Sequence, residues 1–461
     1  METANSKYLK MTQTPIPRLV CTLAIPTIIS MMISSIYNMA DTFFVGQIGT
    51  SASAAVGISF SLMAIVQAIG FTLGMGSGNY ISRLLGQQNS KDASYVASTA
   101  FFTALGVGAL FTIIGLIFLD PLVRVLGATP TILPYAKDYV FYILIGIPFI
   151  TASFVLNNIL RFQGSAFYAM FGITFGGLLN IGLDPLFIFG FNMGTGGAAL
   201  ATIISQFISF CLLLFASGRG GNIKINLKDF KFDWSIYKEI LSGGLPSFYR
   251  QGLASIATIC LNLIAGPFGD AAIAAMSIVT RVFQFAVSIL LGFGQGFQPV
   301  CGFNYGAKLY GRVIEAFWFC IKTAVIVLSI MAVIGFIFAP QIISIFRKGD
   351  PAVTSIGTMA FRLQCITFPL SSWIIINNML LQTIGESKKA SILALARQGL
   401  FFLPPILILP KLFGILGIEL SQPIADLLTF IIAIPMGTRV LNKLKILQKE
   451  DQEPAGEKVI I

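Results

Sequence analysis

The chain of 461 residues contains no histidine, and its six cysteines are scattered. The missing histidine excludes His-based acid–base catalysis, and without clustered cysteines we expect no transition-metal site. A P-loop of the form Gly-x-x-x-x-Gly-Lys-Ser/Thr is also missing, which excludes ATP hydrolysis by that route. We therefore expect neither an enzyme nor a bound cofactor. The cysteines lie inside apolar segments, as small core residues do, rather than in a disulfide framework: Cys21, Cys211, Cys260, Cys301, Cys320 and Cys365.

Charge is also scarce, because only 11% of the residues are charged while 56% are hydrophobic. Soluble domains carry about 25% charged residues. Apolar segments of about 20 residues, long enough to cross a bilayer, recur along nearly the whole chain, and residues 101–119 are an uncharged example. Backbone groups in lipid must bond within their own segment, and the segments lack the alternation of a membrane barrel. We predict an all-α polytopic membrane protein.

The hydropathy pattern predicts about twelve transmembrane helices. The first apolar segment has full length and no small-residue cleavage site after it, so we expect no cleaved signal peptide. The predicted spans are 18–44, 52–84, 93–119, 133–160, 166–190, 196–218, 238–265, 270–303, 311–339, 353–384, 388–412 and 418–440.

Lysine and arginine are distributed unequally between the two sets of loops that these spans define. One set holds Lys7, Lys10, Arg83, Lys91, Arg161, Lys224, Lys228, Lys231, Lys308, Arg312, Lys388, Lys389, Lys443, Lys445 and Lys449. The other set holds Arg124, Lys137, Arg347, Lys348 and Lys411. Basic loops stay in the cytoplasm, so we expect a multi-pass protein of the cell membrane with both termini inside. The net charge of +11 then favours anionic lipids as partners rather than nucleic acid.

The chain repeats itself at an offset of 220 residues, at which Pro26 matches Pro246. At the same offset Gly46 matches Gly266, and the pair Asn157-Asn158 matches Asn377-Asn378. Each half has an even number of spans, so the repeat is parallel and predicts two pseudo-symmetric six-helix bundles. We expect a first lobe at 1–218, a cytoplasmic linker lying on the headgroups at 219–237, a second lobe at 238–441 and a cytoplasmic tail at 442–461.

Such a duplication suits a secondary transporter, in which two halves rock about a central site. A channel can have the same duplication without needing it, and a receptor rarely has it. We expect a protein that works as a monomer.

Two acidic residues of the first half lie inside apolar segments. Asp41 lies in the segment 19–45, with no basic residue between Arg18 and Arg83, and Asp184 lies in the fifth span. An acid at that depth costs about 3 kcal/mol on insertion scales. At the repeat offset these positions hold Leu261 and Pro404, so the second half does not repeat the acids. This one-sidedness favours a functional role over an architectural one.

The chemistry of these acids points to a cation. A carboxyl group shielded from water can exchange a proton, and an ionised one attracts a cation such as Na⁺, which favours oxygen ligands by analogy with hard divalent ions. Asp41, Asn180, Asp184 and Thr202 can supply such oxygens, and Asn180 and Asp184 are four residues apart on one helix face. In the alternative, the two acids form structural ion pairs with Arg250 or Arg281.

The second half has its own charged residues within predicted spans, namely Arg250, Arg281, Arg397 and Asp426. From their opposite charges we predict that Arg281 and Asp426 pair. The eighth span is unusually polar, because it contains Gln284, Gln295, Gln298 and Pro299. These glutamines can line a cleft or join helices.

Three further features can be interpreted either as architectural or as functional. Pro26 permits a bend in the first span but can equally be static packing, and the ladder Gly70, Gly74 and Gly78 favours helix packing over binding. A predicted substrate cleft combines aromatic, soft and amide side chains, which accept varied amphiphilic molecules. Such side chains also face lipid or the core. The predicted cleft residues are Met31, Tyr37, Tyr139, Asn157, Gln284, Gln298 and Arg281.

The chain resembles the multidrug and toxic compound extrusion (MATE) family over nearly its whole length. The resemblance rests on Pro26, on the segments 37–46 (Tyr-Asn-Met-Ala-Asp-Thr-Phe-Phe-Val-Gly) and 70–76, on 180–185 (Asn-Ile-Gly-Leu-Asp-Pro) and on 292–299. It implies cation-coupled drug export, a first-lobe cation site at Asp41, Asn180, Asp184 and Thr202, and a first-helix bend at Pro26. One branch of the family also uses second-lobe acids. Here Leu261 and its neighbours are not acidic, so the chain is similar to the bacterial and archaeal branch.

The expected function is secondary active efflux of amphiphilic or cationic organic compounds in exchange for Na⁺ or H⁺. The alternative is an exporter or flippase of lipid-linked or other amphiphilic metabolites, which a cleft lined by many arginines would favour. A channel or receptor is the alternative from another class.

Overall fold

The computed structural model describes residues 4–219, 223–346 and 350–452, which form helices joined by short connections. The predicted loop residues Arg347 and Lys348, together with tail residues 453–461, lie outside the described residues. Within the described part, 11 helices are long and apolar enough to span a membrane, or up to 12 if one bent pair counts as a single span. The prediction of an all-helical polytopic protein with about twelve spans is confirmed.

The first lobe begins with a short helix, α1 (Ala4–Gln13), that was not predicted. Its long helices follow in chain order and are joined by the short helix α5 (Leu119–Val125) and by a π-helical turn, η1 (Leu186–Gly190), after α7. These long helices are α2 (Ile16–Gly46), α3 (Thr50–Gly86), α4 (Ser90–Ile117), α6 (Leu133–Phe162), α7 (Ala166–Pro185) and α8 (Gly194–Arg219).

The second lobe follows the same order. Its elements are α9 (Trp234–Ala265), η3 (Gly266–Phe268), α10 (Asp270–Gly306), α11 (Tyr310–Ile337), α12 (Ala339–Phe346), α13 (Pro351–Thr367), α14 (Leu370–Thr383), α15 (Ser387–Leu395), the π-helical η4 (Ala396–Leu400), α16 (Leu403–Phe413) and α17 (Ile415–Gln452). The predicted single span 388–412 is thus divided into α15, η4 and α16, and α17 runs past the predicted lobe boundary at 441.

The repeat found in the sequence is visible in the helix bounds. Helices α3 and α10 both contain 37 residues, α4 and α11 both contain 28, and each pair starts 220 residues apart. The halves differ at the fourth long element. Helix α6 runs unbroken through Pro148, whereas the corresponding segment breaks between α13 and α14, which meet at 55°. Pro369 stands at this break and has no N–H to continue the helix.

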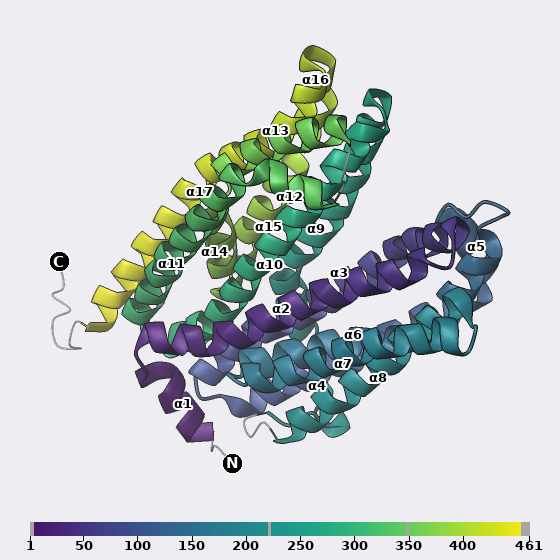
Figure 1. Cartoon of the computed structure of the whole chain (residues 1–461). Coiled ribbons are helices and arrows are strands. Elements are labelled where there is room, and N and C mark those ends of the chain that lie inside the picture. The colour runs from purple at the N-terminus through teal and green to yellow at the C-terminus, as the bar shows by residue number, and fades with distance from the viewer. Residues whose placement is uncertain (1–3, 220–222, 347–349, 453–461) are drawn as a thin grey trace.

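The two lobes are in contact at one end and apart at the other (Figure 1). Figure 1 shows α1 and the end of α17 near the contact end, while α5 and α16 mark the separated ends. Helix α3 of the first lobe packs on α9 of the second, and α10 packs on α2. Each crossing has glycine at the point of closest approach: a Cβ on Gly76 would clash with the Ile240 carbonyl, and one on Gly296 would lie 2.5 Å from the Cα of Ala24.

The predicted packing role of the Gly70 ladder is confirmed. A Cβ on Gly70 would lie 2.8 Å from Phe154, and one on Gly74 would lie 2.6 Å from Asn158, so these glycines bring α3 against α6. The ladder therefore holds the first lobe together.

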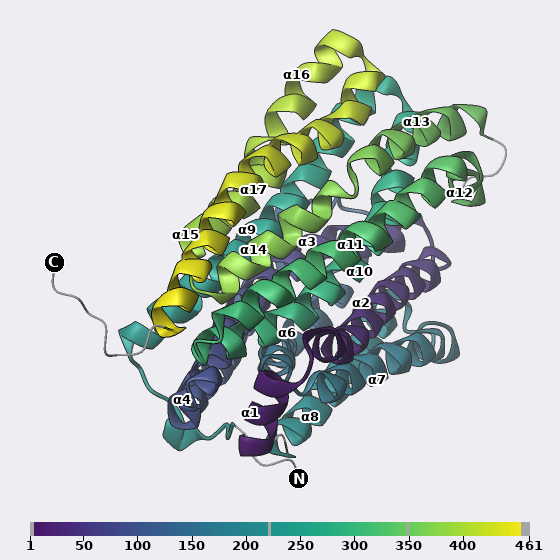
Figure 2. The same cartoon turned by 90° about the vertical axis from the view of Figure 1, so that its left-hand side faces the viewer.

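Helix α1 lies at the contact end, at an angle to the long helices (Figure 2), and is bonded to both lobes. Lys7 Nζ donates to Ser165 Oγ at 2.8 Å in the first lobe. In the second lobe, Asn304 Nδ2 donates to the Met11 carbonyl at 3.1 Å, and Arg312 donates to the Thr14 carbonyl at 2.6 Å. The N-terminal segment thus joins the lobes where they meet.

The described part of the linker lies along α4. The Asn226 amide donates to Ser98 Oγ at 3.1 Å, and the Lys231 amide donates to Thr99 Oγ1 at 3.3 Å. Ile223 is buried against the protein. The predicted linker is therefore hydrogen-bonded to the first lobe, and α9 begins within it at Trp234.

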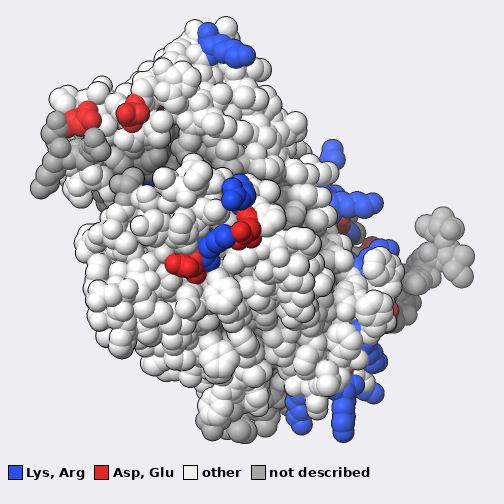
Figure 3. All heavy atoms as spheres, turned by 90° about the vertical axis from the view of Figure 1, so that its right-hand side faces the viewer, with Lys and Arg blue, Asp and Glu red and all other residues white. Residues whose placement is uncertain are grey.

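Charged side chains are few on the face shown in Figure 3, and most of its Lys and Arg side chains gather along one edge and its lower part. The helix order places the first set of basic residues near the helix ends of the contact side, for example Arg83 at the end of α3, Lys308 after α10 and Lys443 near the end of α17. One residue of this set differs, because Arg161 in the last turn of α6 is buried and only 3% exposed.

Candidate functional site

The four predicted cation-site residues come from three neighbouring helices of the first lobe. Asp41 lies on α2, Asn180 and Asp184 on α7, and Thr202 on α8. Helices α2 and α8 both pack on α7. A glycine allows the close approach of α2 and α7, since a Cβ on Gly177 would lie 3.1 Å from the ring of Tyr37.

Hydrogen bonds connect three of the four side chains. Asn180 Nδ2 donates to Asp184 Oδ1 at 3.2 Å, as their spacing of four residues on a helix allows. The same amide group lies 3.4 Å from Thr202 Oγ1, and the Thr202 hydroxyl donates to the Ala198 carbonyl at 3.1 Å. Asp41 belongs to the group by electrostatic interaction with Asp184.

Three oxygens of this group have no partner among the described residues. Asp41 Oδ1, Asn180 Oδ1 and Asp184 Oδ2 are buried and accept no hydrogen bond. Asp41 is 6% exposed and Asp184 is 0% exposed. Buried carboxylate oxygens without partners are costly, so this arrangement is suited to a ligand that brings positive charge.

The alternative prediction, in which Arg250 or Arg281 pairs with these acids, is wrong. The ion pairs found among the described residues do not include Asp41 or Asp184. Arg250 instead lines a cavity inside the second lobe, and Arg281 is exposed on α10. The acids are therefore not neutralised by an arginine of the other lobe.

The donor set can hold a proton or a small hard cation. Two carboxylates, one amide carbonyl and one hydroxyl provide oxygen ligands only. No group of three His, Cys, Asp or Glu side chains comes together within the described chain. The set is therefore unlike a transition-metal site and fits Na⁺ or H⁺, with Asp41, Asn180, Asp184 and Thr202 as the residues that would hold the ion.

Three of the predicted substrate residues lie in the first lobe, and two of them, Tyr37 and Tyr139, interact with these acids. Tyr139 on α6 is buried and interacts electrostatically with Asp41, Asp184 and Tyr37. Tyr37 and Met31 lie half-buried on α2. The structure thus brings Tyr37 and Tyr139 to the cation group, while their contact with a substrate stays a prediction.

Two other predicted cleft residues are engaged in packing. Asn157 Nδ2 donates to the Ala169 carbonyl at 3.1 Å, which joins α6 to α7, and Asn378 makes a similar bond to the Ala390 carbonyl in the second lobe. Gln298 is fully buried where the lobes meet, 3.4 Å from Asn79 and Thr383. Their amide groups therefore serve architecture in this structure.

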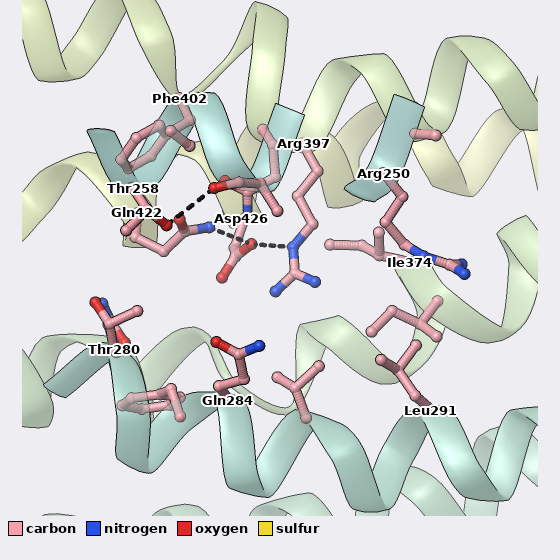
Figure 4. Close-up of a pocket in the computed structure, with 18 of the residues that line it drawn as sticks. Arg250, Thr258, Thr280, Gln284, Leu291, Ile374, Arg397, Phe402, Gln422 and Asp426 are labelled. Carbon is pink, nitrogen blue, oxygen red and sulfur yellow. Dashed lines mark hydrogen bonds and ion pairs between the residues drawn. The ribbon is translucent and has the colours of Figure 1, made fainter. Parts of the chain in front are cut away.

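The second lobe contains a cavity of about 260 Å³, and Gln284 is the predicted cleft residue that lines it. Arg397 on η4 points into this cavity beside Asp426 (Figure 4). Arg397 Nε lies 2.7 Å from Asp426 Oδ1, so the predicted pairing of Arg281 with Asp426 is wrong. Sequence position could not reveal this pair, because Arg397 reaches Asp426 from a different helix, through the π-helical turn.

Each lobe contains a π-helical turn, but η4 lies ten residues earlier than η1 when the lobes are aligned at the 220-residue offset. In the first lobe η1 follows Asp184 and Pro185, and in the second lobe η4 contains Arg397. Such turns widen the helix locally and are frequent at functional sites. Both lobes therefore have a charged residue at an irregular turn, acidic in the first and basic in the second.

Several polar residues of the structure were not among the predicted site residues. Glu419 on α17 is a buried acid of the second lobe, 3% exposed. Arg83 forms an ion pair with Glu239 at 2.8 Å between α3 and α9, across the two lobes. Glu419 could have been found as an acid within the predicted span 418–440, whereas the pairing of Arg83 has no signal in a single sequence.

Residues 26–186 and 246–407 both match the model of the MatE family, and together these segments make up more than half of the chain. This chain belongs to the MatE family. The matched MatE segments begin 220 residues apart, at Pro26 and Pro246, in agreement with the repeat.

Named relatives of this MatE protein resemble it over most of their length. The multidrug export protein MepA of Staphylococcus haemolyticus is 27% identical over 425 residues, which cover 92% of this chain and 93% of that protein. A solved outward-facing multidrug resistance MATE family transporter of the MOP superfamily has a TM-score of 0.89 and 28% identity, covering 95% of this chain and 98% of that one.

A second solved structure is a MOP superfamily transporter from Pyrococcus furiosus, for which a reverse polarity of the binding pocket suggests a different function. It has a TM-score of 0.88 and 28% identity, covering 95% of this chain and 98% of that one. Family membership and these relatives identify the chain as a membrane transport protein.

Proposed function

We propose that this chain is a secondary active multidrug exporter, which moves amphiphilic organic compounds, including cationic ones, outward in exchange for Na⁺ or H⁺. The observation that carries the proposal is the first-lobe group of Asp41, Asn180 and Asp184, in which each side chain has one buried oxygen without a partner among the described residues. The name of the MepA relative supports multidrug export.

Energy for export would come from the ion moving inward. One elementary charge crossing a membrane potential of 100 mV supplies about 2.3 kcal/mol. Because about 1.4 kcal/mol corresponds to a factor of ten, this supports a concentration ratio of about fifty for a neutral substrate. A carboxylate pair that holds either the ion or a cationic substrate is suited to such an exchange.

The arrangement of the lobes supports a mechanism of alternating access. The lobes meet at the lysine- and arginine-rich end and lie apart at the other (Figure 1). If this basic end is cytoplasmic, both termini are inside and the structure is open outward, which agrees with its likeness to an outward-facing relative. Transport then requires the contacts of the basic end to open when the substrate is loaded from the cytoplasm.

Export of lipid-linked or other amphiphilic metabolites remains the second candidate function. The arginines of the second-lobe cavity, Arg250 and Arg397, favour it. Nothing in this candidate requires the first-lobe acids to exchange an ion, so ion dependence distinguishes the two.

The test uses proteoliposomes that contain the full chain and are loaded with the cationic dye ethidium. We expect dye efflux to be driven by an imposed inward gradient of Na⁺ or of H⁺, each applied alone. Asp41→Asn should abolish the driven efflux, whereas Asp138→Asn, which neutralises an exposed acid of α6, should leave it unchanged. Driven efflux at the normal rate in the Asp41→Asn protein would refute the assignment.

A further inference from the structure

The second-lobe cavity lies among α9, α10, α13, α14, α15 and α17 and has a volume of about 260 Å³. Two of its lining residues, Thr258 on α9 and Gln284 on α10, are exposed, so the cavity is accessible between these two helices. Another lining residue, Gln251, lies 3.5 Å from Gln67 on α3 of the first lobe. The cavity therefore borders the region between the lobes.

The charged residues that line the cavity are two arginines and one acid, namely Arg250, Arg397 and Asp426. Asp426 is already occupied, because it accepts from Arg397 Nε at 2.7 Å and from Gln422 Nε2 at 3.1 Å. Arg250 makes no ion pair with any residue that the structure describes. One positive charge is therefore left over in the cavity.

Arg250 and Arg397 also act on one another, since their like charges interact electrostatically. An arginine within a membrane-spanning segment is costly unless it has a partner or reaches water. Placing a second guanidinium close to the first raises this cost. The arrangement is relieved by an anion that contacts Arg250, because the planar guanidinium offers two parallel donors to a carboxylate or phosphate group.

The rest of the cavity wall is largely apolar and aromatic. Phe283 on α10 and Phe368 beside the bend between α13 and α14 stand edge to face, with ring centroids 5.1 Å apart. Figure 4 shows Phe402 at one end of the cavity, while Arg250 lies with Ile374 and Leu291 at the other end. A ligand can thus bind an aromatic body at one end and a charged group at the other.

We propose that this cavity binds an amphiphile through an oxyanion, a carboxylate or a phosphate, held by Arg250 while its apolar body packs on the phenylalanines. The volume is slightly below the usual range for drug-sized ligands, about 300–1,000 Å³, so it admits one or two fused rings rather than a whole lipid. The inference deepens the proposed function, on which it rests, by adding anionic compounds to its substrates.

The test compares three probes that share one naphthalene body: 2-naphthylacetate, 2-naphthylacetamide and 2-(2-naphthyl)ethylamine. Binding to the full chain in phosphatidylcholine nanodiscs is measured by titration calorimetry. We expect the acid to bind at least tenfold more tightly than the amide or the amine. Equal affinities for the acid and the amide would overturn the proposal.

Variants locate the oxyanion. Arg250→Gln should lower the affinity for naphthylacetate about tenfold and leave the affinity for the amide unchanged, which also shows that the variant is folded. Arg250→Lys should lower the affinity for naphthylacetate by a smaller factor, because lysine keeps the positive charge but lacks the two parallel donors. Arg439→Gln, which removes an exposed arginine of α17 outside the cavity, should bind as the wild type does. A preference for the acid that survives Arg250→Gln would contradict the assignment.

The source of the oxyanion is found by adding phosphatidate to the nanodiscs at 0.15 M salt. If naphthylacetate is displaced, a lipid headgroup occupies the site, and if it is retained, the site takes a free acid; both results agree with an oxyanion at Arg250. The ethidium assay separates the two proposals. If the wild-type protein shows no ion-driven dye efflux but still prefers the acid over the amide, only the proposed function is refuted. If dye efflux is normal but the acid is not preferred over the amide, only the inference of an oxyanion site is refuted.

Discussion

Thr383 on α14 donates a hydrogen bond of 2.8 Å to Asn79 Oδ1 on α3, across the boundary between the two lobes. Both side chains are buried, and Gln298 on α10 lies 3.4 Å from each of them. Nearby, Gln382 Nε2 donates to the Gly243 carbonyl at 2.7 Å and to Ser247 Oγ at 2.9 Å, which ties α14 to α9. These polar contacts occur in the same region as the Arg83–Glu239 pair and help to close the contact end.

Removing the Thr383 hydroxyl should favour opening of the contact end. In Thr383→Val, Asn79 Oδ1 keeps only the long contact to Gln298, and a poorly satisfied buried acceptor costs about 1–3 kcal/mol in the closed state. The population of the open state should rise about tenfold or more. The measurement is modification of Cys301, buried on α10 in this region, by an impermeant maleimide, followed by peptide mass spectrometry.

Thr438→Val is the matched control, since the Thr438 hydroxyl bonds only to carbonyls of its own helix, Ile434 and Pro435. It should leave Cys301 modification at the wild-type rate. If Thr383→Val also labels Cys301 at that rate, the contact does not stabilise the closed end.

A single methyl group at the lobe crossing should have a large effect. A Cβ on Gly244 would clash with the Thr72 carbonyl of α3, and backbone at a helix crossing cannot move aside easily. We expect Gly244→Ala to lower the melting temperature and to reduce transport. Gly252→Ala, in the same helix, has nothing within 4 Å of the new atom and should melt at or above the wild-type temperature. Equal melting temperatures for both variants would show that α9 and α3 separate freely.

The amide of Asn180 should discriminate between Na⁺ and H⁺ coupling. Asn180→Leu keeps the side-chain volume but removes one oxygen ligand and the hydrogen bond of 3.2 Å to Asp184. A sodium ion needs this oxygen, whereas a proton needs only a carboxyl group. We expect efflux under a Na⁺ gradient to fall at least tenfold, and efflux under a pH gradient to fall much less. Equal losses under both gradients would mean that Asn180 acts through folding instead.

The contact between the loop after α14 and helix α17 should depend on pH. Glu386 accepts from Lys443 at 2.9 Å and pairs with Lys389 at 3.2 Å. The hydrogen bond from Lys443 and the two positive charges lower the pKa of Glu386 below its usual value. The resulting stability is present above the unfolded pKa, about 4.3, and is lost as the pH falls through the lower folded pKa.

Glu386→Gln should therefore have a lower melting temperature than the wild type at pH 7. The corresponding loss in free energy of unfolding is at most about 1 kcal/mol, because the ion pair is partly exposed. The difference should vanish when melting is measured well below pH 4. A difference that stays constant over this range would show that the ion pair is not its cause.

Much of the fold could be predicted because two signals in the sequence are strong. Apolar segments of membrane length determine the number of helices, and the match of Pro26 with Pro246 at one offset reveals two equivalent bundles. The spacing of Asn180 and Asp184 was enough to place both on one face of a helix, where the structure shows them bonded.

What could not be predicted depends on contacts between distant residues and on local breaks in helices. The sign of a charge suggested a partner for Asp426, but only the turn at η4 makes Arg397 that partner. Gln298 is as polar in the sequence as Gln284, yet one is sealed between the lobes and the other lines a cavity. Pro148 and Pro369 both stand inside spans, but only the second lies at a break.

The central claim, that the first-lobe carboxylates exchange an incoming ion for an outgoing molecule, is tested most directly by running the exchange backwards. In proteoliposomes without an ion gradient, an imposed gradient of ethidium should drive Na⁺ or H⁺ the opposite way, as recorded with ²²Na⁺ or a trapped pH dye. The wild type should show this countermovement, and the Asp41→Asn and Asp184→Asn proteins should not move the ion in response to the ethidium gradient. Countermovement of normal size in either variant would contradict the account.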